Sequence, residues 1–109
     1  MSRLKLISWN INGMRAALKK GFLEWVEATS PDILGLQEIK AKRAQLPLSV
    51  ANLENYYSYW NSAEKKGYSG VAVFSKIKPK AITRKLGEER LDMEGRILGL
   101  KFSDFILYN

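Results

Sequence analysis

The run Ile33-Leu34-Gly35-Leu36 constrains the fold most strongly, because it is an uncharged apolar segment with Pro-Asp before it and Gln37-Glu38 after it. A short apolar run with such boundaries is typical of a strand in the interior of a sheet. The apolar residues of segment 4–7 lead in the same way into Asn10 and Asn12. Each predicted strand therefore presents polar side chains at the point where it ends.

These polar groups suggest a cation site. Ligands of open α/β sheets lie beyond the carboxyl ends of the strands, where the amides of Asn10 and Asn12 and the carboxylate of Glu38 would meet. Mg²⁺ prefers oxygen ligands and often uses only one or two protein carboxylates. The residues alone leave two alternatives open. Glu38 can also point into solvent or pair with Lys40, and Asn-x-Asn-Gly is also an ordinary turn in which an asparagine bonds its own backbone.

The rest of the chain alternates between helical and extended patterns. Apolar spacing predicts a helix over residues 14–29, which Gly21 interrupts so that it can divide into short turns and a helix. A second helix is predicted over 45–53, with Pro47 near its start. The buried stripe of the first helix is expected to contain Phe22, Leu23, Trp25 and Val26.

Four further segments have the pattern of strands: 56–60, 70–75, 96–102 and 105–108. Residues 77–79 should break the second of them, and Ser103-Asp104 should form a tight hairpin turn between the last two. These elements predict a layered α/β (α+β) domain with a mixed or largely antiparallel sheet. Trp9, Trp25 and Trp60 are expected to pack in its core and not to stack on nucleic-acid bases.

Composition narrows the class of partner. Hydrophobic residues make up 46% and charged residues 27%, as in soluble globular proteins, and no apolar stretch approaches the ~20 residues of a membrane helix. The lack of cysteine excludes disulfides and fits a cytoplasmic protein, as does the lack of a signal-peptide pattern. A net charge of +7 favours a polyanionic partner, although ribosomal and membrane-binding proteins share this property.

Four sequence blocks carry a resemblance to a known family. In order they are Trp9-Asn10-Ile11-Asn12-Gly13, Leu36-Gln37-Glu38-Ile39-Lys40, Gly67-Tyr68-Ser69-Gly70-Val71 and Glu94-Gly95-Arg96. Together they resemble the N-terminal part of exonuclease III-type apurinic/apyrimidinic endonucleases, of the endonuclease/exonuclease/phosphatase superfamily. The resemblance extends over all 109 residues. It implies that residues 1–109 are the N-terminal portion of a single domain with a four-layer α/β sandwich, of which the remainder is absent here.

The resemblance implies roles around a metal ion. Glu38 would coordinate Mg²⁺, or Mn²⁺ as the alternative ion, and the ion would act as a Lewis acid on a phosphate oxygen. Asn10 would be a second catalytic residue, either as a ligand or as an organiser of the site. Some members carry aspartate where this chain has the neutral Asn12, which is therefore expected in a supporting role. Lys40 would pin Asn12 or Glu38, or else is a solvated lysine.

The resemblance also implies contacts to DNA. Arg15, Lys19 and Lys20, in or near the first turns of the first helix, would grip the DNA backbone, although a solvated basic face is the alternative. Tyr68 would meet a deoxyribose or a phosphate, unless it is a half-buried hairpin aromatic, and Gly70 would permit close approach. Arg96 would bind a phosphate or form an ion pair with Glu94 that braces the site. Lys65 and Lys66 extend this basic rim.

The sequence lacks several groups that the family's mechanism requires, and this limits the activity expected of the 109 residues alone. The chain has no histidine, no Gly-Asp-x-Asn and no Ser-Asp-His block, and Tyr108 is out of register with the family's Tyr-x-Pro-Asn run. Without a general base we expect the 109 residues by themselves to be inactive.

The whole enzyme, by resemblance, would act as a monomer on double-stranded DNA. It would hydrolyse the phosphodiester 5′ to an abasic site in a Mg²⁺-dependent reaction, with trimming of 3′ ends as a further activity. Two alternatives stay open: a nucleic-acid-binding module without activity, and a related phosphodiesterase that acts on a phospholipid or phosphoinositide.

Overall fold

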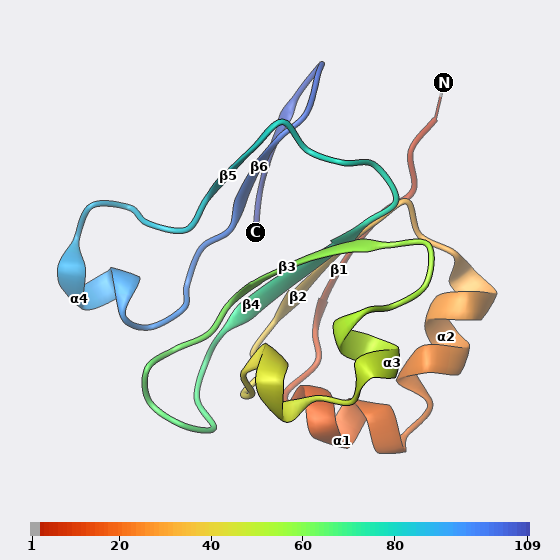
Figure 1. Ribbon diagram of the computed structural model, residues 1–109, viewed down its shortest axis with the longest axis horizontal. Coiled ribbons are helices and arrows are strands. Elements are labelled where there is room, and N and C mark those ends of the chain that lie inside the picture. Colours follow the sequence, from red (N-terminus) through yellow and green to blue (C-terminus); the bar gives the residue numbers. More distant parts are fainter. Residues whose placement is uncertain (1–2) are drawn as a thin grey trace.

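The structure, a computed structural model, describes residues 3–109 and contains two β-sheets, with most of the helices on one side of the first sheet (Figure 1). The strands of the first sheet, in spatial order, are β1 (Leu6–Asn10), β2 (Ile33–Gln37), β4 (Val71–Ser75) and β3 (Tyr57–Asn61). The second sheet consists of β5 (Ala81–Thr83), β6 (Gly99–Lys101) and β7 (Ile106–Tyr108). Among the strands of residues 3–109 only β1 and β2 pair in parallel, so the predicted mixed, largely antiparallel pairing is confirmed, but in two sheets and not in one.

The alternation of side chains along β2 and β4 divides the core into two parts. Leu34, Leu36 and Phe74 pack with the helices, whereas Ile33 and Val73 pack with residues of the second sheet. Successive side chains of a strand point to opposite faces, so a strand covered on both faces must be apolar throughout. This is why an uninterrupted apolar run was a reliable signal for these two central strands.

Three helices cover the face of the first sheet that is opposite the second sheet (Figure 1): α1 (Met14–Lys19), α2 (Phe22–Thr29) and α3 (Leu48–Ala51). Gly21, with φ of 97°, separates α1 from α2, as its position in the sequence predicted. The molecule is therefore layered as helices, sheet and sheet. Among residues 3–109, no helix has the length and apolar character that crossing a bilayer requires.

Several predicted boundaries were wrong. The helix expected over 45–53 is only α3, preceded by a 3₁₀ turn (Arg43–Gln45), because Pro47 disfavours a helical conformation at Leu46. The strand expected over 96–102 is shortened to β6. Neither the three-residue β5 nor α4 (Glu89–Asp92) was expected, since both are short and lack a clear apolar period.

The hairpin turn between β6 and β7 is confirmed. The Phe102 N–H donates to the Phe105 carbonyl oxygen at 2.8 Å across Ser103-Asp104. The pairing also continues beyond β6, because Leu98 and Asn109 exchange backbone hydrogen bonds of 2.8 and 2.7 Å. The Asn109 side chain also contacts the first sheet, at the carbonyl oxygens of Leu36 and Ala72.

Candidate active site at the carboxyl ends of β1 and β2

The parallel register of β1 and β2 brings Asn10 next to Glu38. Asn10 is opposite Gln37, so Glu38 is the first residue beyond the paired strands. The Asn10 Nδ2 donates to Glu38 Oε2 at 2.5 Å, while Asn10 Oδ1 accepts the backbone N–H of Asn12 at 3.1 Å. Asn10 therefore forms the ordinary asparagine turn and holds the Glu38 carboxylate as well.

Lys40 completes this group. Its Nζ donates to Asn12 Oδ1 at 2.6 Å and lies 3.7 Å from Glu38 Oε1. Lys40 is therefore held by both partners that the sequence offered as alternatives. The Glu38 side chain remains 43% exposed, so a ligand can reach it from solvent. We call Asn10, Asn12, Glu38 and Lys40 the strand-end cluster.

Backbone hydrogen bonds on both sides hold the segment that carries Glu38 and Lys40. Carbonyl oxygens of Glu38 and Ile39 accept the N–H groups of Gly13 at 2.7 Å and Met14 at 2.9 Å. On the other side, the Ile39 and Lys40 N–H groups donate to carbonyls of the 69–70 turn at 3.2 and 2.9 Å. Ile39 is fully buried between these loops, which leaves its two neighbours at the surface.

The packing of Ile39 explains why position 70 is a glycine. It has φ of 86°, and a Cβ atom there would lie only 2.8 Å from Ile39 Cγ1. Gly70 is buried, so its missing side chain makes room for Ile39. Its expected contact with DNA stays a prediction of the sequence.

A second polar group forms around Tyr68. The Arg96 Nε donates to Glu94 Oε1 at 2.9 Å, and Arg96 Nη2 donates to the Tyr68 hydroxyl at 2.7 Å. The hydrogen bond with Glu94 raises the pKa of Arg96 above its ordinary value. The expected Glu94–Arg96 ion pair is therefore present, and the Arg96 side chain remains 48% exposed to an incoming anion. We call Tyr68, Glu94 and Arg96 the Tyr68 group.

Gly95 allows this group to form. Its φ is 61°, and a Cβ atom would lie 2.6 Å from both the Asn61 carbonyl oxygen and the Ala63 backbone nitrogen. Only glycine lets the 94–96 segment pass so close to the chain that follows β3. The sequence showed Glu94 and Arg96 as candidates but gave no sign of this close approach.

The basic residues of α1 are not equivalent. Arg15 is in its first turn, and its Nη2 donates to the Lys40 carbonyl oxygen at 3.1 Å, a contact that the sequence did not predict. Lys19 and Lys20 lie near the first turn of α1, as expected, and because this short helix ends at Lys19 they are also at its carboxyl end. Basic side chains there complement the helix dipole. Both are exposed, and their binding to DNA stays a prediction.

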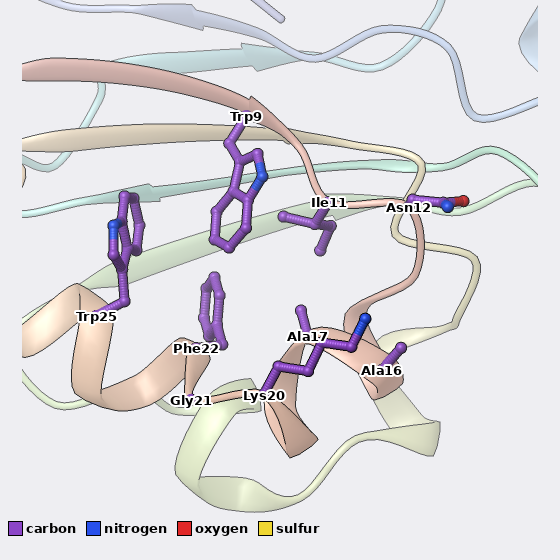
Figure 2. Close-up of a pocket in the computed structure, with 9 residues that line it drawn as sticks. All are labelled: Trp9, Ile11, Asn12, Ala16, Ala17, Lys20, Gly21, Phe22 and Trp25. Carbon is purple, nitrogen blue, oxygen red and sulfur yellow. The ribbon is translucent and has the colours of Figure 1, made fainter.

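A cavity of about 330 Å³ lies beside α1 and α2 and is mainly apolar (Figure 2). Trp9 packs against Trp25 with ring centroids 4.8 Å apart and against Phe22 at 5.9 Å. In Figure 2 the Asn12 side chain points away from these rings. Trp60 in turn packs edge-on against Phe74 at 5.5 Å, so all three tryptophans pack against the core as predicted.

Asn109 is the residue near the site that sequence reasoning missed. Its Nδ2 donates to the Leu36 and Ala72 carbonyl oxygens, each at 3.0 Å, and its Oδ1 accepts from Gln37 Nε2 at 2.6 Å. Gly35 leaves space for it, since a Cβ atom there would lie 3.2 Å from the Asn109 side chain. Asn109 thus joins the second sheet to the end of β2, immediately before Glu38. No local pattern could have shown this contact.

The chain is similar to known nucleases. Residues 7–109 match the Endonuclease/Exonuclease/phosphatase family. The chain is 46% identical over 102 residues to an exodeoxyribonuclease of Bacillus subtilis (strain 168), covering 93% of this chain and 39% of that relative. It is 43% identical over 108 residues to DNA repair nuclease APEX1 of Danio rerio, covering 97% of this chain and 35% of that relative.

The fold comparison agrees. An AP endonuclease from Archaeoglobus fulgidus superposes with a TM-score of 0.79 and 27% identity, covering 98% of this chain and 40% of that one. The α/β fold class expected from the resemblance is therefore confirmed, over a chain that spans only 35–40% of the length of these three proteins. With residues 7–109 matched, the chain belongs to the Endonuclease/Exonuclease/phosphatase family.

Proposed function

We propose that this chain forms the metal-binding and part of the DNA-binding surface of a DNA repair nuclease. The observation that carries the proposal is the strand-end cluster, in which the Glu38 carboxylate is oriented by Asn10 at 2.5 Å yet remains open to solvent. The similarity to an exodeoxyribonuclease and a DNA repair nuclease supports this assignment. The chain would make up part of one larger domain, as its partial coverage of these relatives suggests.

The donor set fits a hard divalent cation. Glu38 supplies the carboxylate of the strand-end cluster, and among residues 3–109 no group of three His, Cys, Asp or Glu side chains gathers in one place. Mg²⁺ is commonly held by one or two carboxylates, with waters and substrate phosphate completing its ligands. Glu38 would hold Mg²⁺ or Mn²⁺, which would supply Lewis-acid stabilisation of charge on the phosphate.

The protein side chains would orient this centre. Asn10 holds the Glu38 carboxylate and would become a ligand only by turning its amide oxygen away from the Asn12 N–H. Lys40 neutralises Glu38 before the ion arrives and fixes Asn12. Arg15 supports the Lys40 backbone, and this leaves part of its guanidinium free for a phosphate.

The substrate of the whole protein would be double-stranded DNA. Arg96 and Tyr68 would contact its backbone, and the reaction would be hydrolysis of the phosphodiester 5′ to an abasic site, with removal of nucleotides from 3′ ends as a related activity. The 109 residues contain no histidine and none of the later catalytic blocks, so by themselves they would bind DNA without turnover. Such binding would fall steeply with salt.

A chimera tests the proposal. Residues 1–109 would replace the matching segment of the Bacillus subtilis exodeoxyribonuclease, and incision of a duplex with one abasic site would be measured in Mg²⁺ and in EDTA. We expect Mg²⁺-dependent incision that Glu38→Gln lowers by about two to four orders of magnitude, because an ion at the reacting phosphate contributes several kcal/mol. Glu27→Gln, an exposed carboxylate on α2, is the matched control and should retain full activity. Equal incision by the Glu38→Gln chimera would contradict the proposed role.

A further inference from the structure

The apolar cavity beside α1 and α2 is not used by the proposed function (Figure 2). Its volume of about 330 Å³ lies within the range of roughly 300–1,000 Å³ that is typical of small-molecule sites. Asn12 borders it, but its side chain points away from the aromatic rings. Neither Glu38 nor Lys40 lines the cavity, so it is separate from the proposed metal site.

Small residues leave this space open. Ala17 is buried on α1 and brings only a methyl group to the cavity, and Ala16 borders it from the same helix. Gly21 adds no side chain, at its left-handed position between α1 and α2. Protein interiors are normally packed without voids much larger than a water molecule. A space of this size beside buried residues is therefore a candidate binding site.

Aromatic rings form one wall of the cavity. Phe22 is buried, whereas Trp9 and Trp25 are only partly buried and leave part of each indole open to a ligand. The Trp9 and Phe22 rings are stacked, with an angle of 23° between their planes. Aromatic side chains bind other planar rings by offset stacking and by edge-to-face contact. The wall therefore favours a flat aromatic ligand.

Two hydrogen-bond donors at the cavity lack a partner. Within the described part of the chain, the Trp9 indole N–H has no protein acceptor, whereas that of Trp60 donates to the Ser58 hydroxyl at 3.1 Å. Lys20 takes part in none of the ion pairs of the same residues. In Figure 2 the Trp9 nitrogen is on the edge of the ring that faces Ile11, and the Lys20 ammonium ends on this side as well. A ligand with an anionic acceptor would satisfy both donors.

We propose that this cavity binds a small planar aromatic acid. Its rings lie against Trp9 and Phe22, and its carboxylate accepts from the Lys20 ammonium and the Trp9 indole N–H. A nucleobase suits the cavity less well, because the aliphatic and aromatic walls would leave its polar edges without partners. The site requires neither a metal ion nor DNA, so it is independent of the proposed function.

Titration of the full chain with naphthalene-2-carboxylate tests this site. The readout is the indole N–H signals of the tryptophans in ¹H–¹⁵N NMR spectra. We expect saturable shifts of the Trp9 and Trp25 signals with a Kd of about 1 mM or tighter. The Trp60 signal should not move, because Trp60 does not line the cavity. No saturable shift, or equal shifts of all the tryptophans, would overturn the proposal.

Substitutions locate the carboxylate and the rings. Lys20→Gln should weaken binding of the acid by about two- to fivefold, as expected for a solvent-accessible ion pair, and leave binding of the neutral 2-naphthylmethanol unchanged. Lys19→Gln removes the same charge beside the cavity and is the control. Ala17→Leu should abolish binding, because the larger side chain takes the space of the ligand. Ala28→Leu adds the same atoms at an exposed position of α2 and should bind as the wild type does.

Three results would contradict the assignment to an aromatic acid. Equal affinity for the acid and the alcohol in the wild type would show an apolar hole without a site for an anion. Equal effects of Lys20→Gln and Lys19→Gln would indicate diffuse charge. Tighter binding of deoxyadenosine 5′-monophosphate than of the acid would assign the cavity to a nucleotide instead.

Discussion

Three residues of the strand-end cluster have left-handed backbone conformations: Asn12 with φ of 49°, and Glu38 and Lys40 with φ of 54°. Asparagine adopts this region readily, whereas glutamate and lysine do so at a cost of roughly 1 kcal/mol or more. The hydrogen bonds on both sides of Ile39 hold the segment in this form. Such strain at the residues that carry the charged side chains is a frequent property of functional sites.

This strain can be measured by comparing glycine with alanine at one position. Lys40→Gly should be more stable to urea than Lys40→Ala by about 1 kcal/mol, because both lose the same side chain but only glycine relieves a positive φ. At Lys19, at the end of α1, the order of stability should reverse: Lys19→Ala should be more stable than Lys19→Gly, because glycine is unfavourable in a helix. A Lys40→Ala variant that is the more stable of the pair would show that the backbone is not strained.

The charge of Lys40 should weaken metal binding to the free protein. Its Nζ lies 3.7 Å from Glu38 Oε1, and a divalent ion at Glu38 must compete with it. Removing one positive charge at such a distance in water is worth about 1 kcal/mol, so Lys40→Met should bind Mn²⁺ roughly fivefold more tightly. Lys40→Arg, which keeps the charge, is the control for a titration followed by electron paramagnetic resonance. Weaker binding by Lys40→Met would mean that the lysine supports the ion instead.

At the scale of elements, the quality of the sequence prediction followed the burial of each segment. β2 and β4 were predicted well because both faces are covered and their sequences are apolar throughout. β5 and α4 were missed because their residues are largely exposed, which leaves no apolar period to detect. The apolar runs also predicted that Asn10 and Glu38 lie close together. Each run leads into one of these residues, and the ends of adjacent strands meet at one edge of a sheet.

Contacts between distant elements could not be predicted. Asn109 reaches the end of β2 only because the second sheet packs on the first, and Arg15 reaches the Lys40 carbonyl only because the loops adopt positive φ. The Glu94–Arg96 pair was predictable because its members are two residues apart, but its link to Tyr68 was not. The sequence thus indicated which side chains lie close together at the ends of β1 and β2, but not the contacts that hold them in place.

Gly95 and Gly67 provide a matched test of how the β3–β4 region is held. Both have φ above 60°, but a Cβ atom would meet backbone atoms at 2.6 Å at Gly95 and nothing within 4 Å at Gly67. Gly67→Ala should therefore cost about 1–2 kcal/mol, the cost of the left-handed conformation alone. Gly95→Ala should lower the free energy of unfolding by clearly more, because the backbone must also move apart. Equal losses in urea unfolding would contradict the close approach.

The stability of the whole molecule should depend on Tyr56 at alkaline pH. Burial, with the nearby charge of Asp32, raises the pKa of Tyr56, and its hydroxyl donates to the Pro31 carbonyl oxygen at 2.6 Å. A raised pKa in the folded state means that its stabilisation is complete below the unfolded value of about 10 and is lost as the pH rises above it. Tyr56→Phe should lose about 1 kcal/mol at pH 7, and this difference should shrink above pH 10. A difference that is constant with pH in urea unfolding would contradict the assignment.

The two candidate groups are mechanically joined in the molecule as a whole. The turn after Tyr68 accepts the N–H groups of Ile39 and Lys40, so the Tyr68 group and the strand-end cluster lie on one connected surface. The chain as a whole has a net charge of +7, which favours a polyanionic partner. We propose that a divalent ion binds this surface at Glu38.

Paramagnetic broadening by Mn²⁺ in ¹H–¹⁵N NMR spectra of the protein tests that claim most directly, because it detects weak binding and reports its location. We expect broadening centred on the amides of residues 10–13 and 37–40 in the wild type and in Glu27→Gln, and none there in Glu38→Gln. Broadening centred on another part of the chain, or unchanged at these residues in Glu38→Gln, would contradict it.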